Sequence, residues 1–355
     1  ILAFGVCAAP GRAYDVNDSF SVSGIAVAGL QCQDLDTGGP DSCKDGHPFQ
    51  VEIAINDAGR HTVFAKLGFA AENGLGPVSP FALSPWAADL HDDLRDINGR
   101  GRDHLLTAWY RHRRVLPGGT SIAVTLGLID ATDYLDDNAF ANDEYTQFMN
   151  EAFVNAPTAF LPSYDWGGVF EVEHGPWALR LVQMRVGEND DGAGYSFTGG
   201  QLSYTRQTRL GEGTYRVIVA GTSDDFLDPR GARRRSLAQL TLSADQELGE
   251  TLGAFLRLGW QDDDAAVTHA ALYSGGLTLK GGAWGRPGDG IGIGYAQLDG
   301  GNSGVSRSHV GEVYYRAAFG EHWALTGDVQ FVKDDRAGGA GRKGRIYSLR
   351  ATKEF

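Results

Sequence analysis

Charged and aromatic side chains recur inside segments of the chain that are otherwise apolar. Arginine and carboxylate groups that lie side by side can hydrogen-bond the hydroxyl groups of a polar solute, and tryptophan or tyrosine rings can stack on its flat face. For any single residue of this kind, a structural ion pair across a protein wall is at least as good an explanation as contact with a solute. The residues concerned are Glu52, Lys66, Trp109, Arg111, Glu171, Glu173, Arg216, Arg257, Lys280, Glu312, Tyr314, Arg316, Asp328, Gln330 and Arg350.

These side chains lie in segments whose polarity alternates with a period of two. Between residues 120 and 130, apolar side chains occupy every second position, with small or polar ones between them. Segments 236–246 and 323–331 repeat the scheme. A half-buried β-strand has this period, so the pattern predicts strands. The sequence contains no run of about 18 or more apolar residues, which excludes a membrane-spanning helix.

About sixteen strands are predicted, and their connections alternate between short and long. The strands are expected to begin near Ser19, Phe49, His61, His104, Thr120, Gly167, Trp177, Thr198, Gly213, Ser236, Leu252, Ala271, Gly290, His309, Trp323 and Arg345. The short connections are 57–60, 115–119, 174–176, 210–212, 247–250, 286–289 and 320–322. The long ones are 33–47, 71–103, 131–166, 187–197, 223–235, 262–270, 299–308 and 333–344.

This alternation predicts an all-β fold, a transmembrane antiparallel up-and-down β-barrel with short periplasmic turns and long outer loops. The apolar face of each strand would contact lipid, and the other face would line a lumen, because charged side chains are costly against lipid. Residues 14–355 are expected to form this single domain. The final strand, which ends on Phe355, is expected to close the barrel.

The first thirteen residues are expected to be the remainder of a secretory signal peptide. They are apolar and then small, with cleavage expected after Ala13, and polar residues follow at once. An ordinary first strand is the alternative. Export would place Cys32 and Cys43 in an oxidising compartment, where they are predicted to form a disulfide that closes a short loop. Two free thiols are the alternative.

Two of the long connections have helical spacing. Residues 85–94 have the spacing of a helix, with Ser84 before them as its cap, and residues 138–150 show a similar pattern. Loops of this length are usually functional, and one folded into a barrel would narrow it. The alternative is an outer lid. The constriction candidates in the second loop are Asp133, Asp136, Asn138, Asn142, Asp143 and Glu144.

Signals for other classes of protein are weak. The formal charge of −14 argues against nucleic-acid binding. The glycine pattern in residues 291–295 lies within an expected strand and lacks a following helix, so it fails the context for dinucleotide binding. Residues 262–264 could hold Ca²⁺, but a solvated acidic loop is favoured because the glycine and glutamate of an EF-hand are missing. We therefore expect no cofactor, no metal and no enzyme activity.

Several segments carry a resemblance to a known family. They are residues 66–71, 131–144, 146–148, 292–295, 310–315 and 328–330. On these segments the chain resembles the carbohydrate-selective porins of the OprB-like family. The resemblance extends from about residue 20 to the end of the chain. The most specific part is the Asp-Tyr-x-Asp-x-Asn-x-x-Ala-Asn-Asp-Glu segment within residues 131–144. The resemblance implies a sixteen-stranded barrel, often monomeric, that passes sugars through a narrowed pore.

The sequence thus favours passive diffusion of small polar solutes, with carbohydrates first among them, across the outer membrane of a Gram-negative bacterium. Its expected partners are outer-membrane lipids and the solutes, as a monomer or homotrimer. The first alternative is a barrel sleeve around a partner protein in the lumen, for electron transfer or secretion, although such conduits should need a wider barrel. The second is an outer-membrane hydrolase, for which no converging catalytic groups are visible.

Overall fold

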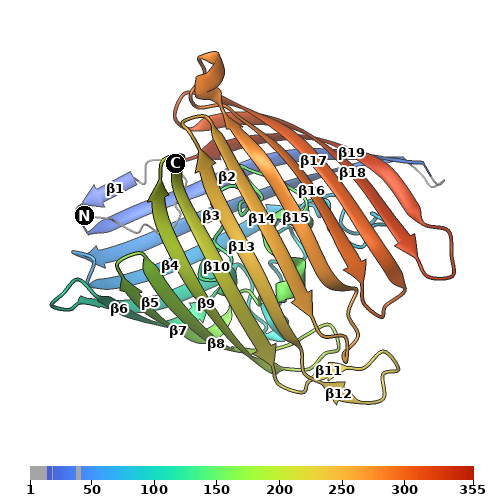
Figure 1. The fold of residues 1–355 in the computed structure, drawn as a ribbon, viewed down its shortest axis with the longest axis horizontal. Helices are drawn as coiled ribbons and strands as arrows, with labels where there is room; N and C mark the ends of the chain where they lie inside the picture. The colour runs from blue at the N-terminus through green and yellow to red at the C-terminus, as the bar shows by residue number, and fades with distance from the viewer. Residues whose placement is uncertain (1–13, 18, 37–40) are drawn as a thin grey trace.

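The protein is described here by a computed structural model that covers residues 14–17, 19–36 and 41–355. The expected signal segment, residues 1–13, and its cleavage site lie outside the described residues. In the described part, sixteen strands form a closed ring in which all neighbours are antiparallel (Figure 1). They are β2 (Phe20–Leu35), β3 (Ser42–Asp57), β4 (His61–Ala71), β5 (Leu105–Val115), β6 (Ser121–Ile129), β7 (Asp165–His174), β8 (Trp177–Val186), β9 (Tyr195–Thr208), β10 (Gly211–Thr222), β13 (Ala238–Leu248), β14 (Leu252–Gln261), β15 (His269–Lys280), β16 (Gly290–Gly300), β17 (Val305–Phe319), β18 (Trp323–Arg336) and β19 (Arg342–Glu354).

Few other elements occur among the described residues. A short strand β1 (Tyr14–Asn17) pairs with β2, and β11 (Phe226–Leu227) and β12 (Arg234–Arg235) form a small hairpin at one end of the barrel (Figure 1). The helices are single turns: α1 (Glu151–Val154), η1 (Ile97–Gly99), η2 (Ala131–Asp133), η3 (Pro157–Ala159) and η4 (Gly281–Trp284). No helix in the described ranges has the length and apolar character needed to cross a membrane.

The ring closes through the pairing of β19 with β2. Their register runs from Gly344 opposite Leu35 to Glu354 opposite Ile25. Closure leaves no sheet edge with unpaired backbone groups, which is the condition for a β-structure in lipid. The predicted up-and-down barrel of about sixteen strands is confirmed, and every strand except β3 begins within four residues of its expected start.

The two faces of the barrel have inverted polarity relative to a soluble β-protein. Along β18, Trp323 is 53% exposed and Phe331 is 52% exposed, whereas Thr326, Asp328 and Gln330 are buried. Apolar side chains therefore point outward, and the polar ones point into the barrel. This arrangement is stable where the outer surface meets lipid and the polar side chains find partners or water inside.

Three of the expected long loops are short in the structure. The connections after β2, β16 and β18 span only residues 36–41, 301–304 and 337–341. The strands continue past the last apolar position because backbone hydrogen bonding between neighbours does not require alternating polarity. The expected short turn 286–289 is longer in the structure than predicted. Residues 281–289, which include η4, connect β15 to β16.

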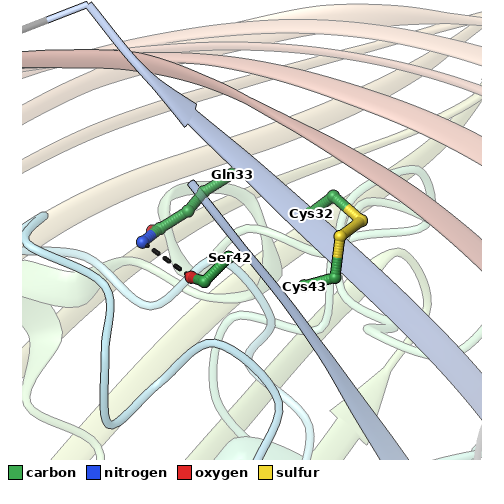
Figure 2. Close-up of a disulfide and its surroundings, with 4 residues drawn as sticks. All are labelled: Cys32, Gln33, Ser42 and Cys43. Carbon is green, nitrogen blue, oxygen red and sulfur yellow. Dashed lines mark hydrogen bonds between the residues drawn. A yellow bond between two sulfur atoms is a disulfide. The ribbon is translucent and has the colours of Figure 1, made fainter. Parts of the chain in front are cut away.

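Cys32 and Cys43 form a disulfide between facing positions of β2 and β3 (Figure 2). The pair lies on one side of the two strands, while Gln33 donates a hydrogen bond of 3.1 Å to Ser42 on the other side. The bridge therefore joins two paired strands near the ends that meet at their connection.

Removing this disulfide should lower stability without opening the barrel. We expect the double variant Cys32→Ser, Cys43→Ser to lose about 3 kcal/mol of unfolding free energy, because the bridge restricts a short loop of the unfolded chain. The β2–β3 ladder persists in the variant, so heat-modified migration in gels should still report a closed barrel. Unfolding in guanidinium, followed by tryptophan fluorescence, measures the loss. Equal midpoints for the variant and the oxidised protein would contradict the expectation.

Candidate functional site: the barrel lumen

Two long connections turn into the barrel instead of covering it. We name residues 72–104, between β4 and β5, the first inner loop, and residues 130–164, between β6 and β7, the second inner loop. Their backbones hydrogen-bond to inward-facing side chains of β2, β8 to β10, β13, β14 and β17 to β19. The two loops also contact each other, since Ala87 N–H donates to the carbonyl of Met149 at 2.9 Å.

Arg257 of β14 is a fully enclosed anchor for the second inner loop. Its Nε lies 2.8 Å from a carboxylate oxygen of Asp136, and both side chains are completely buried. The guanidinium also donates to the carbonyls of Phe153 and Val154, at 2.7 and 3.2 Å. A buried ion pair stabilises only when its remaining donors are satisfied, and these carbonyls satisfy them.

A second arginine pair holds the start of the same loop. Asp137 lies between Arg180 of β8, at 2.7 Å, and Arg216 of β10, at 2.8 Å. Arg216 also pairs with Asp245 of β13. On the strands beside Arg216 and Arg257, the facing residues are serines, which are small enough to let long side chains lie across the wall. These serines are Ser203, Ser243 and Ser274.

The opposite stretch of the wall holds both inner loops together. Glu312 of β17 accepts the backbone N–H groups of Met149 and Asn150. Gln330 of β18 donates to the carbonyl of Pro85 at 2.8 Å and accepts from the Asn150 amide at 3.0 Å. One wall side chain therefore bridges the first inner loop to the second.

These anchors explain why the two expected helices do not form. Arg350 of β19 donates to the carbonyls of Glu144 and Gln147. The Glu144 carbonyl would otherwise accept the N–H group of Phe148 in a helix that spans residues 138–150. In residues 85–94 the carbonyl of Pro85 is likewise taken by wall glutamines. The helix predictions were wrong because tertiary hydrogen bonds replaced local ones.

Aromatic packing fills the rest of the space between the second inner loop and the wall. Phe148 and Phe153 pack against Phe255 of β14 and Tyr314 of β17, with ring centroids 4.9 to 6.2 Å apart. The wall opposite them is built from glycine, and a Cβ on Gly294 would lie 2.9 Å from Phe153. A Cβ on Gly292 or Gly276 would likewise collide with the rings of Tyr314 or Phe255. The glycines of residues 291–295 therefore make room for rings inside a strand.

Many residues predicted to line an open pore are therefore covered by the inner loops. Arg257, Glu312 and Arg350 are fully buried, and Arg216 and Asp328 nearly so. Neither predicted aromatic is free to stack on a solute. Tyr314 meets Phe148 edge to face, and Trp109 stacks on Phe64 at 4.9 Å. These inward side chains act as supports, because the two loops occupy the lumen in front of them.

The remaining predicted lumen residues form partly exposed ion pairs on β3 to β7. Lys66 and Glu52 are 3.5 Å apart, and Arg111 lies 3.0 Å from Glu171. Glu173 pairs at 3.5 Å with Arg113, which the sequence interpretation did not include. Nearer the short-turn end, Lys280 pairs with Glu247 and Arg316 with Glu354. This wall retains accessible charges of both signs.

The six constriction candidates of the second inner loop have four different kinds of surroundings. Asp136 and Asn138 are buried against the wall, where Asn138 donates to the carbonyl of Ala244 at 3.1 Å. Asn142 and Asp143 hydrogen-bond within the loop. Asp133 belongs to a set of carboxylates that interact electrostatically with Lys66, together with Glu52, Asp89 and Asp130. Glu144 is half-buried.

Asp89 of the first inner loop meets the second inner loop next to Lys66. Its carboxylate accepts from the Tyr164 hydroxyl at 2.6 Å and from Gln50 of β3 at 3.2 Å. Gln50 also donates to the Tyr145 hydroxyl at 3.0 Å. Sequence reasoning missed Asp89, whose only signal was its place in a helix-like pattern that did not form. Burial raises the pKa of Asp89 to about 6.

A closed barrel whose lumen is narrowed by loops folded against its wall defines the porin class of membrane channels, which are not enzymes. The chain matches the family model described as carbohydrate-selective porin, OprB family, over residues 91–345. An uncharacterized protein of Aquifex aeolicus (strain VF5) is 30% identical over 256 residues, 72% of this chain and 72% of that protein. The chain belongs to the carbohydrate-selective porin family.

Solved structures show the same fold at low sequence identity. The high-pH structure of Pseudomonas putida OprB has a TM-score of 0.75 and 13% identity, with 95% of this chain and 94% of that chain covered. Pseudomonas aeruginosa OccK11 (OpdR) has a TM-score of 0.55 and 12% identity, with 95% and 96% covered. A mutant Rh. blastica porin has a TM-score of 0.55 and 15% identity, with 95% and 100% covered.

Loss of the Arg257 anchor should widen the channel. In Arg257→Gln, Asp136 stays buried without its counter-ion, which costs about 3 to 5 kcal/mol and favours release of the second inner loop. Single-channel conductance in planar bilayers should rise and become noisy. The control is Arg307→Gln, since Arg307 pairs with Asp299 at the exposed long-loop end and touches neither inner loop. Unchanged conductance in Arg257→Gln would contradict the anchor role.

Ion selectivity should depend on pH around the pKa of two carboxyls beside Lys66 inside the barrel. Desolvation inside the barrel raises the pKa of Asp133 to about 6, as it does for Asp89. Both groups are thus charged at neutral pH and lose their negative charge as the pH falls through about 6. Lys66, Asp93, Tyr164 and Gln50 face Asp89.

We expect the preference for cations over anions, measured as the reversal potential in a potassium chloride gradient, to fall between about pH 7.5 and pH 5. The variant Asp89→Asn, Asp133→Asn should show the low preference at both values. If the cation preference of this variant still falls fully between pH 7.5 and pH 5, groups other than Asp89 and Asp133 cause the pH dependence.

Proposed function

We propose that the protein is a passive diffusion channel for small carbohydrates in the outer membrane of a Gram-negative bacterium. The carrying observation is the asymmetry of the lumen. Most of the wall side chains that hold the inner loops lie on β8 to β10, β13, β14 and β17 to β19, so we assign the solute path to the charged inner face of β3 to β7. Membership of the carbohydrate-selective porin family supports the same substrate class.

The chemistry of this face suits sugars. The side chains of Arg111 and Lys66 are 22% and 16% exposed and that of Glu52 is 25% exposed, so two donors and one acceptor are reachable from the lumen, whereas Glu171 beside Arg111 is buried. A guanidinium can donate to one hydroxyl while the carboxylate beside it accepts from the next. This arrangement matches the vicinal hydroxyls of a sugar ring. These groups are already paired with one another, so each hydrogen bond to a sugar replaces part of an existing ion pair. Sugar binding is therefore weak. Weak binding permits release, which passive transport requires.

The two alternative functions receive less support. A sleeve around a partner protein needs an open lumen, whereas here buried side chains such as Arg257 and Glu312 hold the inner loops in that space. A hydrolase needs an accessible nucleophile whose base is oriented by a third group. Ser308 of β17 contacts His269 of β15, but it is buried and donates its own hydroxyl to Asp334, which therefore does not orient the histidine. Monomer and homotrimer both remain predictions.

Replacing one wall pair should weaken sugar binding. In Arg111→Gln the charged donor beside Glu171 is lost, and we expect the sugar concentration that blocks half of the ion current to rise by about 10-fold, as for a lost hydrogen bond to a charged group. The measurement is glucose and maltose titration of conductance in planar bilayers, with liposome swelling as a second readout. The matched control is Lys333→Gln on the exposed long-loop end. A protein that forms steady pores indifferent to every sugar would be a porin of another selectivity.

A further inference from the structure

A cavity of about 770 Å³ opens at the long-loop end, between the first inner loop and the end of the second. Four carboxylates line it, and their residues are Asp89, Asp92, Asp93 and Glu151. One cation, Arg95, also lines it, but its guanidinium pairs with Asp103 at 3.4 Å. Asp89 lies in this cavity and also contacts Gln50 of the wall, so the cavity leads toward the Lys66 region of the lumen.

The carboxylates of the cavity carry no strong counter-ion. Within the described residues, none of the four lies within 4.0 Å of a lysine or arginine nitrogen, and the one ion-pair partner is His91, 3.5 Å from Asp92. Their other contacts come from neutral donors: Asp93 accepts from Leu90 N–H and Glu151 from Ser84 N–H, at 2.9 and 2.8 Å. The cavity thus presents net negative charge, which raises the local concentration of cations.

Gln31 of β2 adds an acceptor that has no protein partner. Its side chain lines the cavity and is 1% exposed, and its amide nitrogen donates to the carbonyl of Pro85 and the hydroxyl of Ser348, both at 3.2 Å. These two bonds fix the amide. Its Oε1 has no hydrogen-bond partner among the described residues. A buried acceptor left in this state favours a bound group that donates hydrogen bonds.

We infer that this cavity is an entrance site for small polyhydroxylated amines, that is, protonated amino sugars, and that it disfavours acidic sugars of the same size. The inference rests on the proposed function, since it assumes that sugars pass through the barrel. The carboxylates attract the ammonium group, and Gln31 and Asp89 accept from the hydroxyls. Beyond Asp89, the solute meets Glu52, Asp130 and Asp133 around the single ammonium of Lys66, so negative charge continues inward.

The test compares three sugars of similar size: glucosamine, glucose and gluconate. Each is titrated at about pH 7 against the current of single channels, where glucosamine is mainly protonated and gluconate is an anion. We expect half-block by glucosamine at about 5-fold lower concentration than by glucose, as for one weakly screened ion pair, and by gluconate at higher concentration still.

The variant is Asp92→Asn, Asp93→Asn, in which the amide oxygen introduced at position 93 can still accept from Leu90 N–H. It should erase most of the glucosamine advantage while changing the value for glucose by less than about 2-fold, because only a charge is removed. The matched control removes two charges from a different connection, Asp262→Asn with Asp263→Asn, and should leave all three sugars unchanged. If the double variant fails to close into a barrel, Asp92→Asn alone replaces it, since that side chain is 73% exposed.

The outcomes separate the two proposals. No sugar block at all would overturn the proposed function, and with it this site. Block by glucose with equal affinity for glucosamine and gluconate would overturn the entrance site alone. A glucosamine preference that survives Asp92→Asn, Asp93→Asn would also overturn it, by assigning the preference to charges elsewhere in the lumen.

Discussion

The ion pair between Arg257 and Asp136 is the interaction on which the lumen of this barrel depends. The strand ladder closes the barrel without help from side chains, but a closed barrel of sixteen strands is wide. The second inner loop stays in it because a fully buried arginine pairs with its aspartate and binds its carbonyls. Separating such a pair leaves a buried charge without a partner, so release of the loop is unfavourable in free energy.

The same loop also needs a wall shaped to receive it. Glycines on β15 and β16 leave hollows for Phe255, Phe153 and Tyr314, and serines beside Arg216 and Arg257 leave space for their side chains. The polar and aromatic contacts therefore act together: arginines bind the backbone of the loop while rings exclude water from around those bonds. Because most of these anchors lie on β8 to β10, β13, β14 and β17 to β19, the partly exposed charges of Glu52, Lys66 and Arg111 are left on the other side of the lumen.

Charge follows the same division. On the filled side, Arg216 and Arg257 pair with carboxylates, while Glu312 and Arg350 bind the loop backbone, and all four serve structure. On the open side, carboxylates outnumber cations, from Asp92 and Asp93 at the long-loop end to Asp133 near Lys66. A narrow passage with excess charge of one sign selects by charge as well as by size. A preference for neutral and cationic sugars is the expected result.

The sequence by itself determined the barrel, because a period-two pattern and regular turns are local properties. It predicted sixteen strands, their starts and which residues face inward, and the resemblance within residues 131–144 identified the family. It could not tell an inward residue that binds a loop, such as Arg257, from one that stays partly exposed in the lumen, such as Arg111, since both alternate with apolar neighbours. Only the tertiary structure decided this, because the partners of Arg257 are backbone carbonyls about 100 residues away in the chain, and carbonyls leave no mark in a sequence. The same bonds turned two helical patterns into irregular loops.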